Sequence, residues 1–143
     1  LAVAESVTGG LVGSRLTDVS GSSRYFLESI VAYADDSKVK YLGVRRETLA
    51  SKGAVSEEVA REMAEGARAR SGATWAVATT GIAGPLGATA AKPVGLVYVA
   101  VAGPARTRVE RHNFEGDRLA VKAASAEAAL RLLREEVGAA GGA

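Results

Sequence analysis

Short runs of apolar residues alternate along the chain with segments of helical spacing. Leu1–Ala4 and Thr74–Thr80 are almost continuously apolar, which is typical of strands covered on both faces of a sheet. Tyr25–Tyr33 is rich in aromatic and β-branched residues and predicts another strand. Helical patterns follow two of these runs, at Leu11–Thr17 and Asp35–Leu42, so strands and helices alternate in the first part of the chain.

Two longer helices are expected further along. Ser56 is suited to cap a helix that runs to about Arg70, because Glu57 and Glu58 follow in the first turn, where the helix dipole favours anions. The residues expected on its inner face are Val59, Met63 and Ala67. A last helix starts at Gly116-Asp117 and ends at Val137. Its expected apolar stripe consists of Leu119, Ala123, Ala126, Leu130, Leu133 and Val137.

Gly95–Ala102 and Thr107–Phe114 are close enough in sequence to pair as an antiparallel hairpin, and the second alternates apolar with charged residues, as at a sheet edge. The whole pattern predicts an α/β fold, a three-layer α/β/α sandwich with a mixed, mostly parallel sheet and a late antiparallel hairpin. We expect residues 1–137 to form one domain and residues 138–143 a flexible tail.

Composition narrows the classes of function. Of the 143 residues, 48% are hydrophobic and 24% are charged, without a long apolar run, so we expect no membrane partner. The absence of cysteine excludes disulfides, thiolate catalysis and cysteine-bound zinc, and it fits a cytoplasmic location. The net charge of +2 comes from singly spread basic residues, so we expect no nucleic-acid partner.

The loop after the first strand is the first candidate for chemistry. In a sheet of this class, ligands bind beyond the carboxyl ends of the strands, where the loops Glu5–Gly10, Tyr33–Lys38 and Thr79–Pro85 are expected. The glycines and the helix start after Ser6 offer N–H groups to a phosphate or an oxyanion. Residue type alone favours a simpler role, in which Ser6 or Thr8 caps the helix.

A nucleophilic serine needs a base. His112 lies among charged residues in a predicted strand, so a Ser-His-Asp triad is poorly supported. Lys38 could take the serine proton if burial lowered the pKa of its ammonium. Its spacing from Tyr33 says little by itself, and residue type and position alone favour a solvent-facing helical lysine. Arg118 opposes the helix dipole in a first turn, which a bound anion would offset; a solvated surface arginine is the alternative.

Several motifs in order resemble the C-terminal domain of the CinA (competence/damage-inducible protein) family, which also occurs alone as the nicotinamide-nucleotide amidohydrolase PncC. The resemblance covers essentially the whole chain. The motifs are AESVTGG at 4–10, VSGSS at 19–23, AYADDSKVKYLGV at 32–44, GAVSEEVA at 53–60, TTGIAGP at 79–85, KPVG at 92–95 and GDR at 116–118.

The resemblance implies hydrolysis of the carboxamide of nicotinamide mononucleotide to nicotinate mononucleotide and ammonia, in pyridine nucleotide salvage. It implies a serine-lysine mechanism without metal or cofactor, in which Ser6 is the nucleophile, Lys38 the base and Tyr33 the residue that positions the lysine or relays its proton. The implied substrate-binding residues are Thr8, Gly9, Gly10, Thr80, Gly81, Gly84 and Arg118.

Further expectations follow from the same resemblance. We expect the substrate to be the main partner, together with a second copy in a homodimer. The alternative function is a non-catalytic nucleotide-binding or protein-interaction module linked to competence or DNA damage. Two departures from the family pattern stand near the site: Val7 replaces a usual cysteine, and Leu86 and Ala88 lie where glycine is more common.

Overall fold

A five-stranded sheet in the order β2-β1-β3-β4-β5 forms the centre of the molecule. The structure is a computed structural model that describes residues 1–141. The strands are β1 (Ala2–Glu5), β2 (Glu28–Val31), β3 (Ala76–Gly81), β4 (Leu96–Ala102) and β5 (Thr107–Asn113). The helices are α1 (Leu11–Thr17), the short 3-10 helix η1 (Ser22–Arg24), α2 (Asp35–Leu42), α3 (Arg46–Lys52), α4 (Glu57–Ser71) and α5 (Arg118–Gly141).

The strand directions confirm the predicted mixed sheet. β1 pairs in parallel with β2 on one side and β3 on the other, so that Ala4 lies between Ile30 and Ala78. β4 runs antiparallel to β3, and β5 returns beside β4 as the predicted hairpin and is an outermost strand of the sheet. The carboxyl ends of β1, β2 and β3 therefore lie along the same side of the sheet, where the expected ligand loops emerge. We call this row of strand ends the Ser6 edge, because Ser6 directly follows β1.

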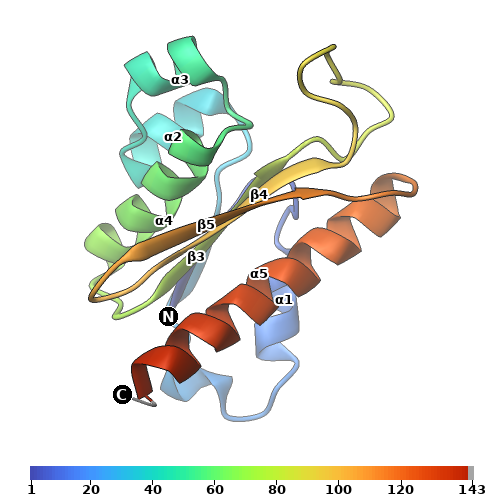
Figure 1. The fold of residues 1–143 in the computed structure, drawn as a ribbon. Coiled ribbons are helices and arrows are strands. Elements are labelled where there is room, and N and C mark those ends of the chain that lie inside the picture. The colour runs from blue at the N-terminus through green and yellow to red at the C-terminus, as the bar shows by residue number, and fades with distance from the viewer. Residues whose placement is uncertain (142–143) are drawn as a thin grey trace.

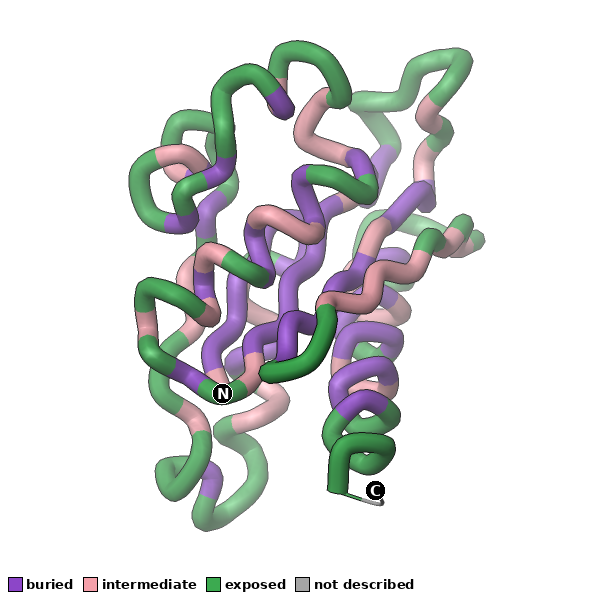
Figure 2. Tube along the Cα trace, turned by 60° about the vertical axis from the view of Figure 1, so that its left-hand side comes forward, coloured by how far each residue is buried: buried purple, intermediate pink, exposed green. Residues whose placement is uncertain are grey.

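The two faces of the sheet differ in side-chain size. Helices α1 and α5 cover one face and α2, α3 and α4 the other, which gives the predicted three layers (Figure 1). Strand residues facing α4 are mostly alanines, whereas those facing α5 are mostly valines. In Figure 2 the buried positions gather in the strands and in the helix turns that face them.

Close packing fixes α2 beside α4. Gly66 lies at the crossing, and a Cβ at this position would come within 1.7 Å of the Leu42 carbonyl oxygen, so only glycine lets the helices approach this closely. The start of α4 is as predicted: the Ser56 side chain caps it by accepting a hydrogen bond from the Val59 amide. Helix α2 carries Lys38, so this packing positions a candidate functional residue.

Two expectations about the elements were wrong, and one helix was missed. β2 is shorter than Tyr25–Tyr33, because the chain is still turning after η1 and pairs with β1 only from Glu28. Helix α3 had no strong local signal and was not predicted. In α5, Leu119 and Val137 are exposed, because the buried face is rotated relative to the expected stripe.

The end of α5 also differs from the expectation. The helix continues beyond Val137 as far as Gly141, while residues 142–143 of the expected flexible tail lie outside the described residues. The domain boundary at residue 137 stays a prediction.

Candidate active site

The carboxyl-end edge of the sheet brings the candidate loops together. Ser6 follows β1, Tyr33 and Lys38 follow β2, and the loop through Gly84 follows β3. The first turn of α5 reaches the same edge: Arg118 donates from Nη1 to the Gly84 carbonyl oxygen at 2.8 Å and from Nη2 to the Tyr33 hydroxyl at 3.1 Å. Arg118 thus links two of the loops, and it is not merely a solvated arginine.

Lys38 is buried, contrary to the alternative of a solvent-facing lysine, and only 1% of the residue is exposed. Its Nζ donates to the backbone carbonyl oxygen of Tyr33 at 2.9 Å, and within residues 1–141 it forms no salt bridge. Burial lowers the pKa of Lys38 from its ordinary value, while the nearby charge of Asp35 opposes this shift. The site therefore contains a buried amine whose ammonium form is less stable than it would be in water.

Tyr33 contacts Lys38 through its backbone and Arg118 through its side chain. The carbonyl oxygen accepts the lysine hydrogen bond, whereas the ring is exposed and its hydroxyl lies against the Arg118 guanidinium. The backbone of Tyr33 thus orients the lysine. Its phenol does not hydrogen-bond Lys38.

Ser6 lies at the end of β1 with its backbone fixed on both sides. Its N–H donates to the Thr79 carbonyl oxygen at 3.1 Å, and its carbonyl oxygen accepts from the Gly9 N–H at 3.1 Å. The hydroxyl forms no hydrogen bond within residues 1–141. Ser6 follows β1, whereas Lys38 lies in α2, which follows the neighbouring strand β2, and the two side chains share no hydrogen bond. Neither Ser6 nor Thr8 caps α1: the N-cap is Gly10, and it makes no side-chain cap bond.

A residue to which the sequence analysis gave no role occupies the start of α1. The Glu5 side chain is fully buried, and its carboxylate accepts hydrogen bonds from Thr8, Gly10, Val12, Gly13 and Ser29. The signal in the sequence is an acidic residue that ends an apolar strand and precedes a glycine-rich helix start. Such a carboxylate can turn back onto the helix N-terminus.

Two of the N–H groups that were expected to bind an anion are already hydrogen-bonded within the protein. The Gly10 N–H donates to Glu5 Oε1 and the Gly9 N–H to Ser6, so neither is free to hold an oxyanion. The N–H groups of Val7 and Thr8 have no hydrogen-bond partner in the described part of the chain. They are the unpaired N–H donors of this loop.

The threonine hydroxyls are also engaged. Thr8 Oγ1 lies 2.6 Å from Glu5 Oε1 and 2.8 Å from Thr79 Oγ1, so Thr8 donates to the carboxylate and accepts from Thr79. Thr80 Oγ1 donates to the Ala54 carbonyl oxygen at 2.8 Å. Thr80 is implied by the family resemblance to bind substrate, but its hydroxyl is already hydrogen-bonded within the protein.

Gly81 and Gly84 are required by packing. A Cβ on Gly81 would lie 2.9 Å from the Leu96 carbonyl oxygen, and one on Gly84, whose φ is +81°, would lie 2.5 Å from a Val94 methyl group. They keep the loop after β3 close to the segment that leads into β4. Their part in the site is to place the Gly84 carbonyl oxygen for Arg118.

A second cation borders the loop after β1. Lys122 follows Arg118 by one turn of α5, and its Nζ lies 3.8 Å from the position that a Cβ on Gly9 would occupy. Residues four apart share a helix face, so both side chains extend from the same side of α5. Lys122 was not predicted from the sequence as a site residue, and its signal there is the spacing of four residues from Arg118.

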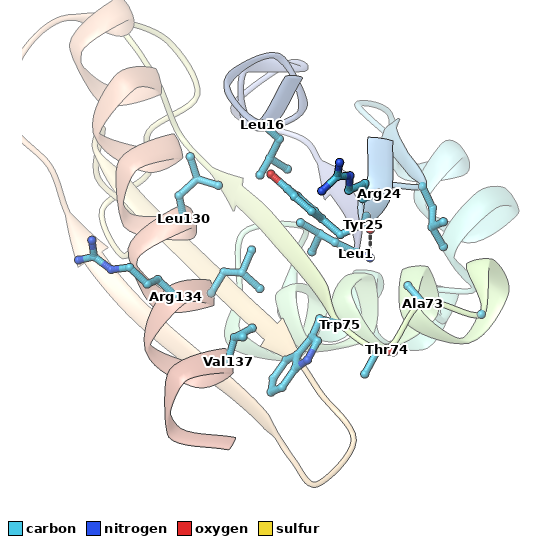
Figure 3. A pocket seen from close by; sticks show the side chains of 13 residues that line it. Leu1, Leu16, Arg24, Tyr25, Ala73, Thr74, Trp75, Leu130, Arg134 and Val137 are labelled. Atoms are coloured by element: carbon cyan, nitrogen blue, oxygen red, sulfur yellow. Dashed lines mark hydrogen bonds between the residues drawn. The ribbon is translucent and has the colours of Figure 1, made fainter. Parts of the chain in front are cut away.

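A cavity of about 780 Å³ lies at the opposite edge of the sheet, around the amino ends of the parallel strands. Figure 3 shows its mainly apolar lining, with Tyr25 and Trp75 facing Leu130 and Val137 of α5. Its lining contains no pairing of a nucleophile with a base. The candidate nucleophile and the candidate base lie instead at the Ser6 edge. His112 is elsewhere too, paired with Glu110 at 3.0 Å and stacked on Phe114.

Within residues 1–141, no group of three histidine, cysteine or acidic side chains is arranged to hold a metal ion. Over the same residues, no helix is both long and apolar enough to cross a membrane.

Comparison with known proteins decides the family. The family described as the CinA C-terminal domain matches residues 1–137. The chain belongs to this family. A CinA-like protein of Geotalea daltonii is 53% identical over 96% of this chain and 33% of its own length. A putative competence-damage inducible protein of Caldicellulosiruptor saccharolyticus is 50% identical over the same shares.

Solved structures of CinA proteins share the fold. Competence/damage inducible protein CihA from Agrobacterium tumefaciens superposes with a TM-score of 0.90 at 42% identity, covering 92% of this chain and 81% of that one. The competence damage-inducible protein A from Klebsiella pneumoniae gives 0.92 at 36% identity, covering 96% and 85%. The chain spans about a third of the length of the curated CinA relatives that it matches.

The residues near the site that depart from the family pattern differ in burial. Val7 is buried in the core on the α5 side of the sheet, so it acts through packing beside Ser6. Leu86 is exposed in the loop that follows Gly84.

Proposed function

We propose that this CinA domain hydrolyses the carboxamide of nicotinamide mononucleotide to nicotinate mononucleotide and ammonia, with Ser6 as nucleophile and Lys38 as base. The observation that carries the proposal is Lys38 itself. It is a buried amine with a lowered pKa, and its hydrogen-bond acceptor is a neutral carbonyl. When one N–H is bound to Tyr33, the lone pair of the neutral amine stays free to accept a proton.

In the first step, neutral Lys38 takes the proton of the Ser6 hydroxyl while Oγ bonds to the amide carbon of the substrate. The tetrahedral intermediate carries an oxyanion, for which the Val7 and Thr8 N–H groups are the available donors in this loop. A single donor of this kind contributes about 3 to 4 kcal/mol to catalysis. The Ser6–Lys38 hydrogen bond forms with the substrate in place, as catalytic hydrogen bonds often do.

In the second step, the intermediate collapses and breaks the carbon–nitrogen bond, and protonated Lys38 returns its proton to the leaving nitrogen. Ammonia departs and leaves an acyl ester on Ser6. Water then attacks the ester while Lys38 again acts as base, which releases the carboxylate product and restores the serine.

The positive side chains of α5 suit the phosphate of a mononucleotide. Arg118 uses two of its five donors on Gly84 and Tyr33, and its other donors have no partner within residues 1–141. Lys122 adds a second cation on the same helix face. The engaged N–H groups of Gly9 and Gly10 favour this end of α5 over the start of α1 as the phosphate site.

The test is ammonia release from nicotinamide mononucleotide by the wild type, Ser6→Ala and Lys38→Ala. We expect each substitution to reduce kcat by about 10²-fold or more. Lys40→Ala on the same helix and Ser14→Ala on α1 are matched controls, because both side chains are exposed, and they should retain turnover.

Near-normal turnover in Ser6→Ala or Lys38→Ala would overturn the assigned role. Thermal stabilisation of the wild type by the mononucleotide without ammonia release would favour the nucleotide-binding module instead.

A further inference from the structure

Glu5 is a buried anion held without a cation. The residue is fully buried, and in residues 1–141 its carboxylate forms no salt bridge. All of its partners are neutral donors. The distances to Glu5 Oε1 are 2.6 Å from Thr8 Oγ1, 3.1 Å from the Gly10 N–H and 2.8 Å from the Val12 N–H. The distances to Oε2 are 3.0 Å from the Gly13 N–H and 2.6 Å from Ser29 Oγ.

These donors come from three segments. Ser29 lies in β2, Thr8 and Gly10 in the loop, and Val12 and Gly13 in the first turn of α1. The first N–H groups of a helix have no partner within the helix, and the dipole makes them an anion site. In many βα loops this site takes a phosphate from a ligand. Here a side chain of the protein fills it.

The nucleophile candidate is carried by the same loop. Ser6 is the next residue after Glu5, and its backbone is tied to Thr79 and Gly9. The Thr8 hydroxyl binds Glu5 and Thr79 at once, so the carboxylate is also connected to β3. Glu5 and Ser6 are therefore held by one set of hydrogen bonds that connects the loop to β3.

We propose that Glu5 is a positioning residue for Ser6: its carboxylate acts as an internal anion at the start of α1 and holds the loop in the reactive geometry before substrate arrives. This inference rests on the proposed role of Ser6 as nucleophile. It also makes the start of α1 unable to take the phosphate of a substrate, so the loop serves the reacting carboxamide.

Glu5→Gln is the sharpest variant, because it keeps the size of the side chain. The amide oxygen can still accept from Thr8, Gly10 and Val12, but the amide nitrogen then faces the Gly13 N–H, donor against donor. Ser29→Ala is a milder change that removes one donor and leaves the carboxylate in place.

The matched control is Glu136→Gln. Glu136 is also a buried carboxylate, but it lies on the last turns of α5 and binds Arg106 and Arg108, far from the loop after β1. The variants are compared in two assays. One measures kcat and KM for ammonia release from nicotinamide mononucleotide. The other measures the rate of covalent labelling of Ser6 by a fluorophosphonate, followed by mass spectrometry, and it does not depend on the natural substrate.

We expect Glu5→Gln to lower both kcat and the labelling rate by about 10²-fold, because small misplacements of a reacting group cost this much. KM should stay within about threefold, since the phosphate contacts lie on α5. Ser29→Ala should lower both rates less, and Glu136→Gln should leave both unchanged below its melting temperature. If Glu5→Gln does not fold, the test rests on Ser29→Ala alone. An unchanged kcat and an unchanged labelling rate in Ser29→Ala would then overturn the proposal.

A folded Glu5→Gln with wild-type kcat and labelling would also overturn it. If the wild type is labelled but releases no ammonia, the proposed substrate is wrong, and slower labelling of Glu5→Gln still supports the positioning role. A wild type that is neither labelled nor active overturns both proposals.

Discussion

At the Ser6 edge of the sheet, the buried carboxylate of Glu5 and the buried amine of Lys38 are hydrogen-bonded to neutral groups, whereas at the opposite edge the buried Glu136 carboxylate is bound by arginines. Arg106 approaches Glu136 at 2.8 Å and Arg108 at 3.2 Å, and Arg108 also bridges to Glu110. A buried charge without an ionic partner costs free energy. The arginines lower the pKa of Glu136, so this pairing favours the folded state, and it connects α5 to the β4–β5 hairpin. The difference is consistent with the proposed function of the Ser6 edge and with a stabilising role for the opposite edge.

The largest expected effect comes from Lys38→Met. Methionine fills a similar volume without a charge, so the cost of burying the ammonium disappears. We expect kcat to fall by about 10²- to 10⁴-fold while the melting temperature rises. Ammonia release and thermal unfolding at neutral pH measure the two effects. A variant that is less stable than the wild type would break the comparison at this edge.

The pH dependence of the same variant sharpens the result. Because burial lowers the pKa of Lys38 below its ordinary value of 10.5, the folded protein binds fewer protons than the unfolded chain between the two pKa values. Stability of the wild type should therefore rise with pH toward 10.5, and Lys38→Met should lack this contribution. Equal slopes of unfolding free energy against pH in the two proteins would contradict the buried-amine interpretation.

Glu136→Gln should act on stability alone. The side chain of Glu136 is 5% exposed and loses charge-assisted hydrogen bonds to two arginines. We expect a loss of about 1 to 3 kcal/mol in the free energy of unfolding, measured by denaturant titration, with kcat unchanged. A fall in kcat without a change in stability would show that the two edges are not independent.

Acid should weaken the Glu136 edge in the wild type. Hydrogen bonds from Arg106 lower the pKa of Glu136 below its ordinary value of 4.5, and the hydrogen bond from Arg131 helps to lower that of Glu110 despite the opposing effect of burial. Their contribution is complete above 4.5 and is lost as the pH falls through the lowered pKa values. Unfolding of Glu136→Gln should depend less on pH in this range, and an identical acid profile would count against the pairing.

The smallest effect is expected for Glu135→Ala, next to Glu136 in sequence. Its side chain is 41% exposed, and its pairs with Arg108 and Arg131 are screened by water. We expect a change of about 0.5 kcal/mol or less in denaturant titration. A loss as large as that of Glu136→Gln would mean that burial does not set the strength of these pairs.

Local signals predicted much of the fold. The bounds of α1 and α2 agree with the predicted Leu11–Thr17 and Asp35–Leu42, because apolar spacing and helix-breaking glycines mark them directly. The hairpin of β4 and β5 was confirmed for the same reason. Helix α3 was missed, since its seven residues are largely polar and pack mainly against α4.

The candidate site was predictable only in part. Ser6, Tyr33, Lys38 and Arg118 were singled out by motif, and the parallel strands bring their segments to one edge. The partners of these residues were not predictable, because a sequence shows neither hydrogen-bond geometry nor burial. The expected use of the Gly9 and Gly10 N–H groups failed for this reason: Glu5 and Ser6 had already taken them.

The sequence by itself determined the order of the strands and of every α-helix except α3, the class of sheet and the family motifs, since these depend on spacing between neighbours along the chain. Only the tertiary structure decided that Lys38 is buried and that Glu5 fills the start of α1. Those outcomes depend on contacts between distant segments: Glu5 meets Ser29 across 24 residues, and Thr8 meets Thr79 across 71. The AESVTGG loop is therefore held in place by residues of the two strands that lie beside it in space, β2 and β3.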